Sequence, residues 1–286
     1  MRVLVIGAET PVGRTLQDLL RRRGRHVEIL SSSDCRWKSE RQAKKSLVRA
    51  ACEFVVDVRI QAAADGGIQI HELDLKRSQW LAKSCHKNMM IYVALSSARL
   101  FSGSLGRPYV EDDLSDNSGA LAQLLSRAED FTRENCERHL ILRFGSIFSH
   151  RGINEVPRML GQLAEGETMS LSDHLSGSPV AADDGAWVIS GILDQLSTGA
   201  QVWGSYHYCS SDPTNCYEFA EVLLASASQF SDISLGAVEL LGREQWQEPL
   251  NRTLDCSKLR STFAIKQSPW RKHVADTVKL YFQSLK

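Results

Sequence analysis

The chain has 286 residues, of which 43% are hydrophobic and 24% charged, as is typical of a globular protein with a substantial core. Its 34 Lys and Arg residues balance its 34 Asp and Glu residues, so no net charge attracts nucleic acid or an anionic membrane. Seven cysteines are scattered without CxxC spacing, and no apolar run reaches the roughly 18 residues of a membrane span. We therefore expect a cytoplasmic protein with no metal site, no nucleic-acid partner and no membrane partner.

Short apolar runs alternate with helical patterns from the first residues. The runs predict strands at Val3–Ile6, Val27–Leu30, Phe54–Val58, Met90–Leu95 and Leu140–Phe144. Apolar residues at helical spacing follow the first run, and further helices are expected at 74–87 and 119–135. The polar, basic segment 30–48 shows no regular period. Apolar strands separated by helices indicate an α/β, Rossmann-type doubly wound parallel sheet.

Beyond residue 148 the pattern loosens. Helices are predicted near 184–197 and 215–229, whereas segment 232–265 has no clear period. We divide the chain into a Rossmann dinucleotide-binding-type domain, 1–148, and a smaller substrate-type α/β lobe, 149–286, some segments of which return to the Rossmann core. In doubly wound folds such a lobe lies at the carboxyl edge of the sheet, where ligands bind.

A glycine-containing turn, Gly7-Ala8-Glu9-Thr10-Pro11-Val12-Gly13, follows the first strand. Glycines in this position let a pyrophosphate approach the N-terminus of the next helix. The central residue of the turn is, however, the β-branched Thr10, and Pro11 has no N–H to donate. The same pair makes a good helix start without any ligand, with Thr10 as N-cap and Pro11 in the first helical position. Dinucleotide binding therefore stays open, with Gly7, Thr10, Pro11, Val12 and Gly13 as its candidate residues.

The residues after the second strand bear on the choice of cofactor. An acidic residue placed directly after this strand would bind the ribose 2′-hydroxyl of NAD. Here three serines, beginning with Ser31, come first, and Asp34 and Arg36 follow. If a nicotinamide cofactor binds, Ser31 and Arg36 favour NADP over NAD, and the damaged turn predicts weak affinity for either.

Several motifs in both halves of the chain share one order and spacing. They are SSARLFSG (96–103), RPYVEDD (107–113), LRFGSIF (142–148), SGSPVAAD (176–183), YHYC (206–209), YEFA (217–220) and NRTLDCSKL (251–259). Together they resemble the dTDP-4-dehydrorhamnose reductase family of extended short-chain dehydrogenases/reductases over nearly the whole chain. The resemblance implies a Rossmann fold, an NAD(P) cofactor and a nucleotide-sugar substrate. It places five residues beside the substrate: Arg99, Phe144, Ser178, Pro179 and Arg252.

The resemblance also locates the catalytic positions of the family. These reductases use a Tyr and a Lys at i and i+4 on one helical face, where the Lys helps the Tyr to give a proton to the carbonyl oxygen. Ala128-Glu129 resembles a Gly-Glu pair that follows the tyrosine by eight residues, which places Leu121 and Leu125 at the Tyr and Lys positions. Ser97 stands at the position of the carbonyl-orienting hydroxyl. The dyad is therefore missing from helix 119–135.

A second departure lies beside the expected cofactor. Asp57-Val58-Arg59 stands where the family has a small Asn-Ala-Ala segment, so Arg59 would crowd the cofactor or meet its phosphates. Arg99 replaces an aromatic residue next to the substrate. Both changes affect the same chemistry as the loss of the dyad.

Three hypotheses follow. We favour a degenerate, non-catalytic member of the family that binds a nucleotide sugar, a dinucleotide or a protein partner. The second is an active NAD(P)H-dependent reductase of a dTDP-4-dehydro-6-deoxy sugar with an altered proton donor. The third is a structural or regulatory subunit without a small ligand, which forms a homodimer through the apolar helix 119–135.

Overall fold

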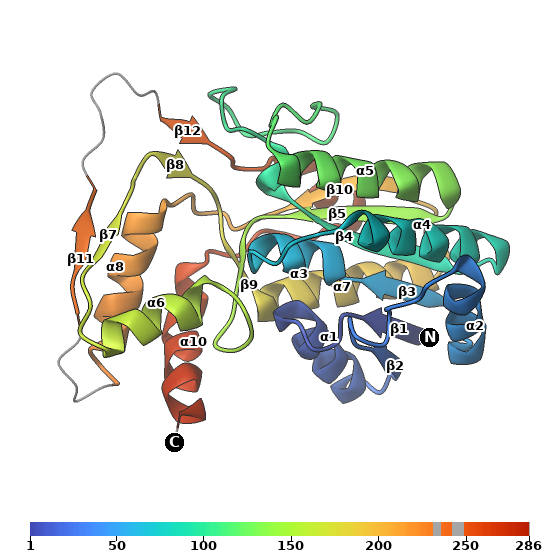
Figure 1. Ribbon diagram of the computed structural model, residues 1–286, viewed down its shortest axis with the longest axis horizontal. Helices are drawn as coiled ribbons and strands as arrows, with labels where there is room; N and C mark the ends of the chain where they lie inside the picture. Colours follow the sequence, from blue (N-terminus) through green and yellow to red (C-terminus); the bar gives the residue numbers. More distant parts are fainter. Residues whose placement is uncertain (231–235, 242–248, 286) are drawn as a thin grey trace.

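The centre of the molecule is a six-stranded parallel sheet with the strand order β10-β5-β4-β3-β1-β2 (Figure 1). The computed structural model describes residues 1–230, 236–241 and 249–285. The strands are β1 (Arg2–Ile6), β2 (His26–Leu30), β3 (Phe54–Asp57), β4 (Ile91–Ser97), β5 (His139–Phe144) and β10 (Gly204–Tyr208). The α/β Rossmann-type fold is confirmed, and the second half of the chain contributes the edge strand β10.

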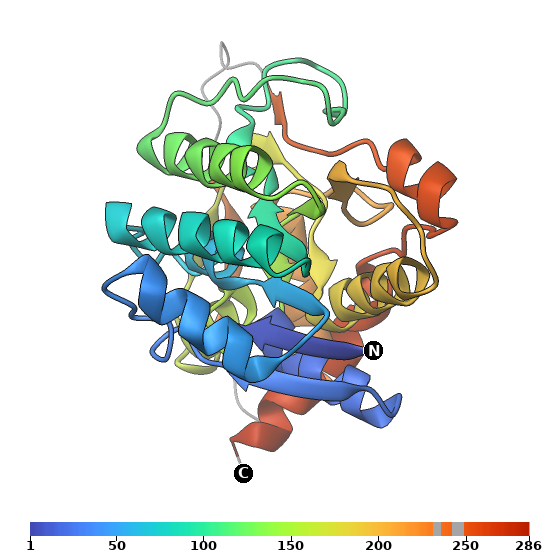
Figure 2. The ribbon, with the colours of Figure 1, turned by 90° about the vertical axis from the view of Figure 1, so that its right-hand side faces the viewer.

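Helices cover both faces of the sheet (Figure 2). The helices α1 (Pro11–Arg22) and α7 (Ala182–Ser197) lie on one face, and α2 (Glu40–Ala50), α4 (Glu72–Lys87) and α5 (Ala120–Asn135) lie on the other. Alternate residues of β1 enter different cores, because successive side chains of a strand point to opposite faces. Val3 and Val5 pack with the cluster under α1 and α7, whereas Leu4 and Ile6 pack with the cluster under α2 and α4.

The prediction that segment 30–48 lacks regular structure is wrong in its second half, because α2 begins at Glu40. Only Ala43 and Leu47 of this helix are buried, so its apolar stripe is two residues wide among basic and polar side chains. Cys35 and Trp37 enter the same core cluster from the preceding loop. A stripe this narrow falls below what sequence periodicity detects.

The second half adds a lobe with its own core beside the sheet (Figure 1). Its helices are α6 (Glu155–Ala164), α8 (Cys216–Ala227) and α10 (Arg271–Ser284), and its short strands are β6 (Ile147–Phe148), β7 (Met169–Leu171), β8 (Leu175–Ser176), β9 (Val180–Ala181), β11 (Val238–Leu240) and β12 (Leu250–Asn251). Helix α9 (Ser257–Phe263) instead returns to the sheet, where Leu259 and Phe263 join the core cluster under α1 and α7. Parts of segment 232–265 are therefore regular, while 232–235 and 242–248 lie outside the described residues.

The carboxyl ends of the strands carry two short elements, α3 (Arg59–Asp65) after β3 and the 3-10 helix η1 (Ala98–Leu100) after β4. They place the candidate residues between the sheet edge and the lobe.

Among the helices of the described ranges, none has the length and apolar character needed to cross a membrane.

Candidate functional site

The glycine turn retains the glycines that its backbone requires. Gly7 has a φ of +84°, a conformation that favours glycine. A Cβ on Gly13 would lie 2.1 Å from the carbonyl oxygen of Gly7, so α1 could not pack this closely against β1 with any other residue. Both glycines are thus explained by the fold, whether or not a dinucleotide binds.

Thr10 is the N-cap of α1, and Pro11 opens the helix, which confirms the capping interpretation. The Thr10 hydroxyl donates to the Gly7 carbonyl at 2.7 Å and accepts from the Gly13 N–H at 3.1 Å. The side chain that replaces the middle glycine therefore uses an N–H group that could otherwise face a phosphate.

Other N–H groups of the turn are also committed. Acceptors within the protein take the N–H groups of Gly7, Ala8, Thr10, Gly13 and Arg14. Pro11 has none, so within the described residues only Glu9 and Val12 retain unpartnered N–H groups at this turn. A pyrophosphate relies on such donors at a helix N-terminus. The residues present therefore do not fit a tightly bound dinucleotide.

A hollow of about 440 Å³ lies against the turn and is called the turn hollow here. Thr10, Pro11, Arg59 and Ile153 are among its lining residues. The loop before α6 lines it with Gly152 and Ile153 and lies close to the turn, since a Cβ on Gly152 would lie 3.2 Å from the ring of Pro11. The hollow thus occupies the expected cofactor cleft, but a loop of the lobe packs directly on the turn.

The two residues expected to favour NADP are separated in the structure. Ser31 lines a second hollow, together with the acidic residues Glu9, Asp18 and Asp34. Its hydroxyl donates to Asp34 at 2.6 Å. Arg36 is exposed and lines neither hollow. Arg14 and Arg151 line the same hollow, but the Nε of Arg14 donates to the Glu9 carbonyl and Arg151 pairs with Asp18. Three carboxylates against two partnered arginines disfavour a bound 2′-phosphate.

Arg59 is committed to an ion pair inside the protein. Its Nε and Nη2 donate to the two carboxylate oxygens of Asp57 at 2.9 and 2.7 Å, and Tyr92 donates to the same carboxylate. The guanidinium also lies over the ring of Trp37. Burial lowers the pKa of Arg59, but the Asp57 carboxylate outweighs it and raises the pKa above its ordinary value. Arg59 therefore stays charged and paired with Asp57, and its Cγ would lie 3.1 Å from a Cβ placed on Gly7.

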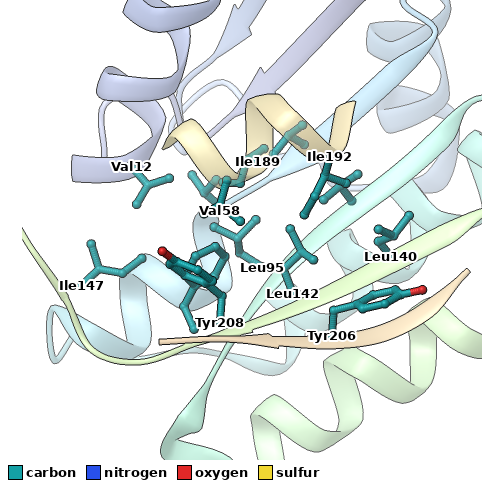
Figure 3. Close-up of a cluster of buried hydrophobic side chains, with 14 of the residues drawn as sticks. Val12, Val58, Leu95, Leu140, Leu142, Ile147, Ile189, Ile192, Tyr206 and Tyr208 are labelled. Atoms are coloured by element: carbon teal, nitrogen blue, oxygen red, sulfur yellow. The ribbon is translucent and has the colours of Figure 1, made fainter. Parts of the chain in front are cut away.

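Two further cofactor candidates, Val12 and Val58, are core residues. Both side chains lie in the hydrophobic cluster between the sheet and α7 (Figure 3). Neither lines the turn hollow.

The three residues at the family's catalytic positions, Ser97, Leu121 and Leu125, do not reach the turn hollow. Ser97 is only 1% exposed, and its hydroxyl accepts from the N–H of Arg99 and lies 3.4 Å from Asp65. Leu125 is fully buried, and the half-buried Leu121 packs against the same core cluster. These side chains line neither the turn hollow nor the hollow described next.

A hollow of about 170 Å³, called the lobe hollow here, lies between η1 and the lobe. It is lined by four of the five residues expected beside a substrate: Arg99, Ser178, Pro179 and Arg252. The fifth, Phe144, is buried in the core, where its ring meets that of Tyr208 edge to face. Sequence reasoning missed Thr214 and Asn215, which reach this hollow through the backbone pairing of Thr214 with Gly177.

The lobe hollow has an excess of positive charge. The Nε of Arg252 is buried without a hydrogen-bond partner, and burial, followed by the charge of Arg99, lowers the pKa of Arg252. The Nε of Arg99 lies 3.4 Å from Asp65, without hydrogen-bond geometry. Glu155 also lines the hollow, but its carboxylate binds Arg158 on the same helix. The arrangement favours an anionic ligand.

Asp65 connects three segments around this hollow. Its carboxylate accepts from the Ile147 N–H at 2.8 Å and from the Gln61 amide at 2.6 Å, besides its contacts with Ser97 and Arg99. Burial raises the pKa of Asp65. Because Asp65 lines neither named hollow, its role is to position η1 and β6.

A buried polar network holds α5 against the sheet. Glu129 of α5 accepts from Nε and Nη2 of Arg143, at 3.0 and 2.8 Å at the shortest. The Nη1 of Arg143 donates to Nε2 of His207, so the Nδ1–H of His207 donates to the Tyr109 carbonyl. Burial, followed by the charge of Arg143, lowers the pKa of His207 to about 3. The polar contacts that anchor α5 to the sheet are thus present, although the helix lacks the Tyr and Lys of the dyad.

A parallel sheet covered on both faces, a glycine turn after β1 and a lobe over the carboxyl edge define a Rossmann-type protein of the extended short-chain dehydrogenase/reductase class. Within that class the chain belongs to the family described as RmlD substrate binding domain, which matches residues 1–282. The activity of the family is that of a dTDP-4-dehydrorhamnose reductase. Within the described residues, no group of three or more His, Cys, Asp or Glu side chains could hold a metal ion.

Relatives and solved structures agree on this family. The dTDP-4-dehydrorhamnose reductase of Burkholderia thailandensis is 25% identical and is covered over 98% of each chain. The crystal structure of the Clostridium acetobutylicum reductase superimposes with a TM-score of 0.80 at 18% identity, covering 98% of this chain and 99% of that one. The Bacillus anthracis reductase, in complex with NADP, gives 0.78 at 17% identity, covering 100% and 99%. At these identities the superpositions establish the fold.

Proposed function

We propose that the chain binds a nucleotide sugar in the lobe hollow without catalysing hydride transfer. One contrast carries the proposal: the hollow keeps Arg252 and gains Arg99, whereas the catalytic positions hold two leucines and a buried serine. We infer that the lobe hollow still binds a ligand, although the catalytic positions beside it no longer carry reactive groups.

The loss of chemistry follows from the missing proton donor. Hydride transfer to a carbonyl forms an alkoxide that needs a proton, and removing general acid catalysis costs roughly 10²–10⁴-fold. Asp65 does not replace the tyrosine, because its carboxyl is buried among four partners and lines neither hollow. Weak NADP or NAD binding is compatible with the turn hollow, but the committed N–H groups disfavour tight binding.

The other two hypotheses have less support. An active reductase would need Ser97 to reach a substrate, which its burial disfavours. A homodimer formed through helix 119–135 would need an apolar face, but Leu125 and Ala128 already pack inside the chain's own core. Mass measurement in solution would test for the dimer and for a protein partner.

Titration calorimetry with dTDP-glucose and dTDP tests the proposal. We expect micromolar binding of the sugar nucleotide, weakened at least about tenfold in Arg252→Ala, because a buried charge–phosphate contact is lost. Arg127→Ala is the matched control, since Arg127 pairs with Glu72 on the outer surface. Absence of nucleotide binding by the unaltered protein would overturn the proposal.

A further inference from the structure

Arg99 introduces a charge that a ligand of the ordinary family type does not need. It stands in η1, two residues after Ser97, and lines the lobe hollow with a side chain that is 34% exposed. Arg252 reaches the same hollow from the segment after β12. One guanidinium therefore comes from the sheet edge, beside the reaction centre, and the other from the lobe.

The neighbouring carboxylates leave Arg99 incompletely neutralised. Asp65 is its nearest acid, at 3.4 Å, but Asp65 is buried and accepts from Ile147 and Gln61. Glu155, which lines the lobe hollow itself, is held by Arg158. No other ion pair of Arg99 occurs within the described residues. A guanidinium left in this state is costly to desolvate unless the ligand supplies an anion.

The chemistry of the ligand follows from this charge. A pyrophosphate can account for Arg252, whereas a neutral 6-deoxy sugar would offer Arg99 only hydroxyl and methyl groups. A carboxylate matches the planar guanidinium with two parallel hydrogen bonds. We infer, on the basis of the proposed function, that the ligand is a nucleotide-activated acidic sugar, a uronate whose carboxylate binds Arg99.

A pair of ligands that differ only in this group tests the inference. The four ligands are glucose and glucuronate attached to thymidine diphosphate, and the same two sugars attached to uridine diphosphate. Within each pair the nucleotide is identical, and the sugars differ only at C6. We expect the glucuronate to bind the unaltered protein at least about tenfold more tightly, as a charge-assisted hydrogen-bond pair supplies. Arg99→Gln should remove the preference, Arg99→Lys should keep part of it, and Arg127→Gln should leave it intact.

The outcomes separate the two proposals. Equal affinity for glucuronate and glucose would overturn the acidic-sugar inference and leave nucleotide-sugar binding in place. Retention of the preference in a folded Arg99→Gln variant would overturn the role of Arg99. Binding of none of the four sugar nucleotides would overturn the proposed function and the inference with it. The comparison of ligands on the unaltered protein decides even where Arg99→Gln fails to fold.

Discussion

Replacing Thr10 by glycine should restore part of the dinucleotide site. The Thr10 hydroxyl accepts from the Gly13 N–H at 3.1 Å, so Thr10→Gly frees that donor and removes the branched side chain at the same point. A hydrogen bond to a charged group contributes about 1.5–3 kcal/mol, which corresponds to roughly a tenfold to hundredfold gain in NADP affinity. The loss of the cap to glycine costs only about a few tenths of a kcal/mol of stability.

Calorimetric titration with NADP⁺ and NADPH across three variants separates the two obstacles. Thr10→Ala frees the N–H but keeps the Cβ, Thr10→Ser keeps the capping hydroxyl, and Thr10→Gly removes both obstacles. We expect affinity to rise in the order Ser, Ala, Gly. Submicromolar binding by the unaltered protein, or no gain in Thr10→Gly over Thr10→Ser, would refute this explanation of the turn.

Three further perturbations have defined outcomes. Leu121→Tyr combined with Leu125→Lys should give NADPH oxidation far below an ordinary rate of about 10 per second. The Tm should fall as well, because a buried position receives a lysine. Turnover at the ordinary rate would show that the cofactor site is intact. The pKa of His207 is depressed from 6.5 to about 3, so the unfolded state binds its proton first as pH falls and stability is lost below pH 6.5. Urea unfolding should lose about 2 kcal/mol from this group between pH 7 and pH 5, and His207→Gln should lack that increment; an unchanged pH dependence in the variant would contradict it. Gly13→Ala should cost at least about 2 kcal/mol by thermal unfolding, whereas Gly161→Ala, inside α6, should be neutral or stabilising by up to about 1 kcal/mol, because its Cβ would make an ordinary contact with the Tyr281 hydroxyl at 3.8 Å. Equal effects of the two substitutions would contradict the packing argument.

Five of the six strands of the sheet could be predicted from sequence because they are short, apolar and regularly separated, whereas the edge strand β10 was not predicted. The Thr10-Pro11 helix start could be predicted as well, because capping depends only on neighbouring residues. Helix α2 could not, since only Ala43 and Leu47 mark its buried side and tertiary packing supplies the rest of its stability.

The candidate site was predictable only where a motif carried it. The resemblance brought Arg99 and Arg252 together from opposite halves of the chain, and both line the lobe hollow. It did not indicate Thr214, which arrives through a bridge to Gly177, or Asp65, whose partners lie on three separate segments. Contacts between residues far apart in sequence leave no local pattern to detect.

The most direct measurement of binding without catalysis follows the hydride itself. The protein would be incubated with dTDP-4-dehydrorhamnose and NADPH deuterated at C4, both at millimolar concentration, and the sugar analysed for deuterium while bound nucleotide sugar is measured in the same sample. We predict stoichiometric binding of the nucleotide sugar with no transfer of deuterium above the protein-free rate. Transfer at about 10 per second, the ordinary rate of an enzyme, would contradict the proposal and identify the chain as a working reductase.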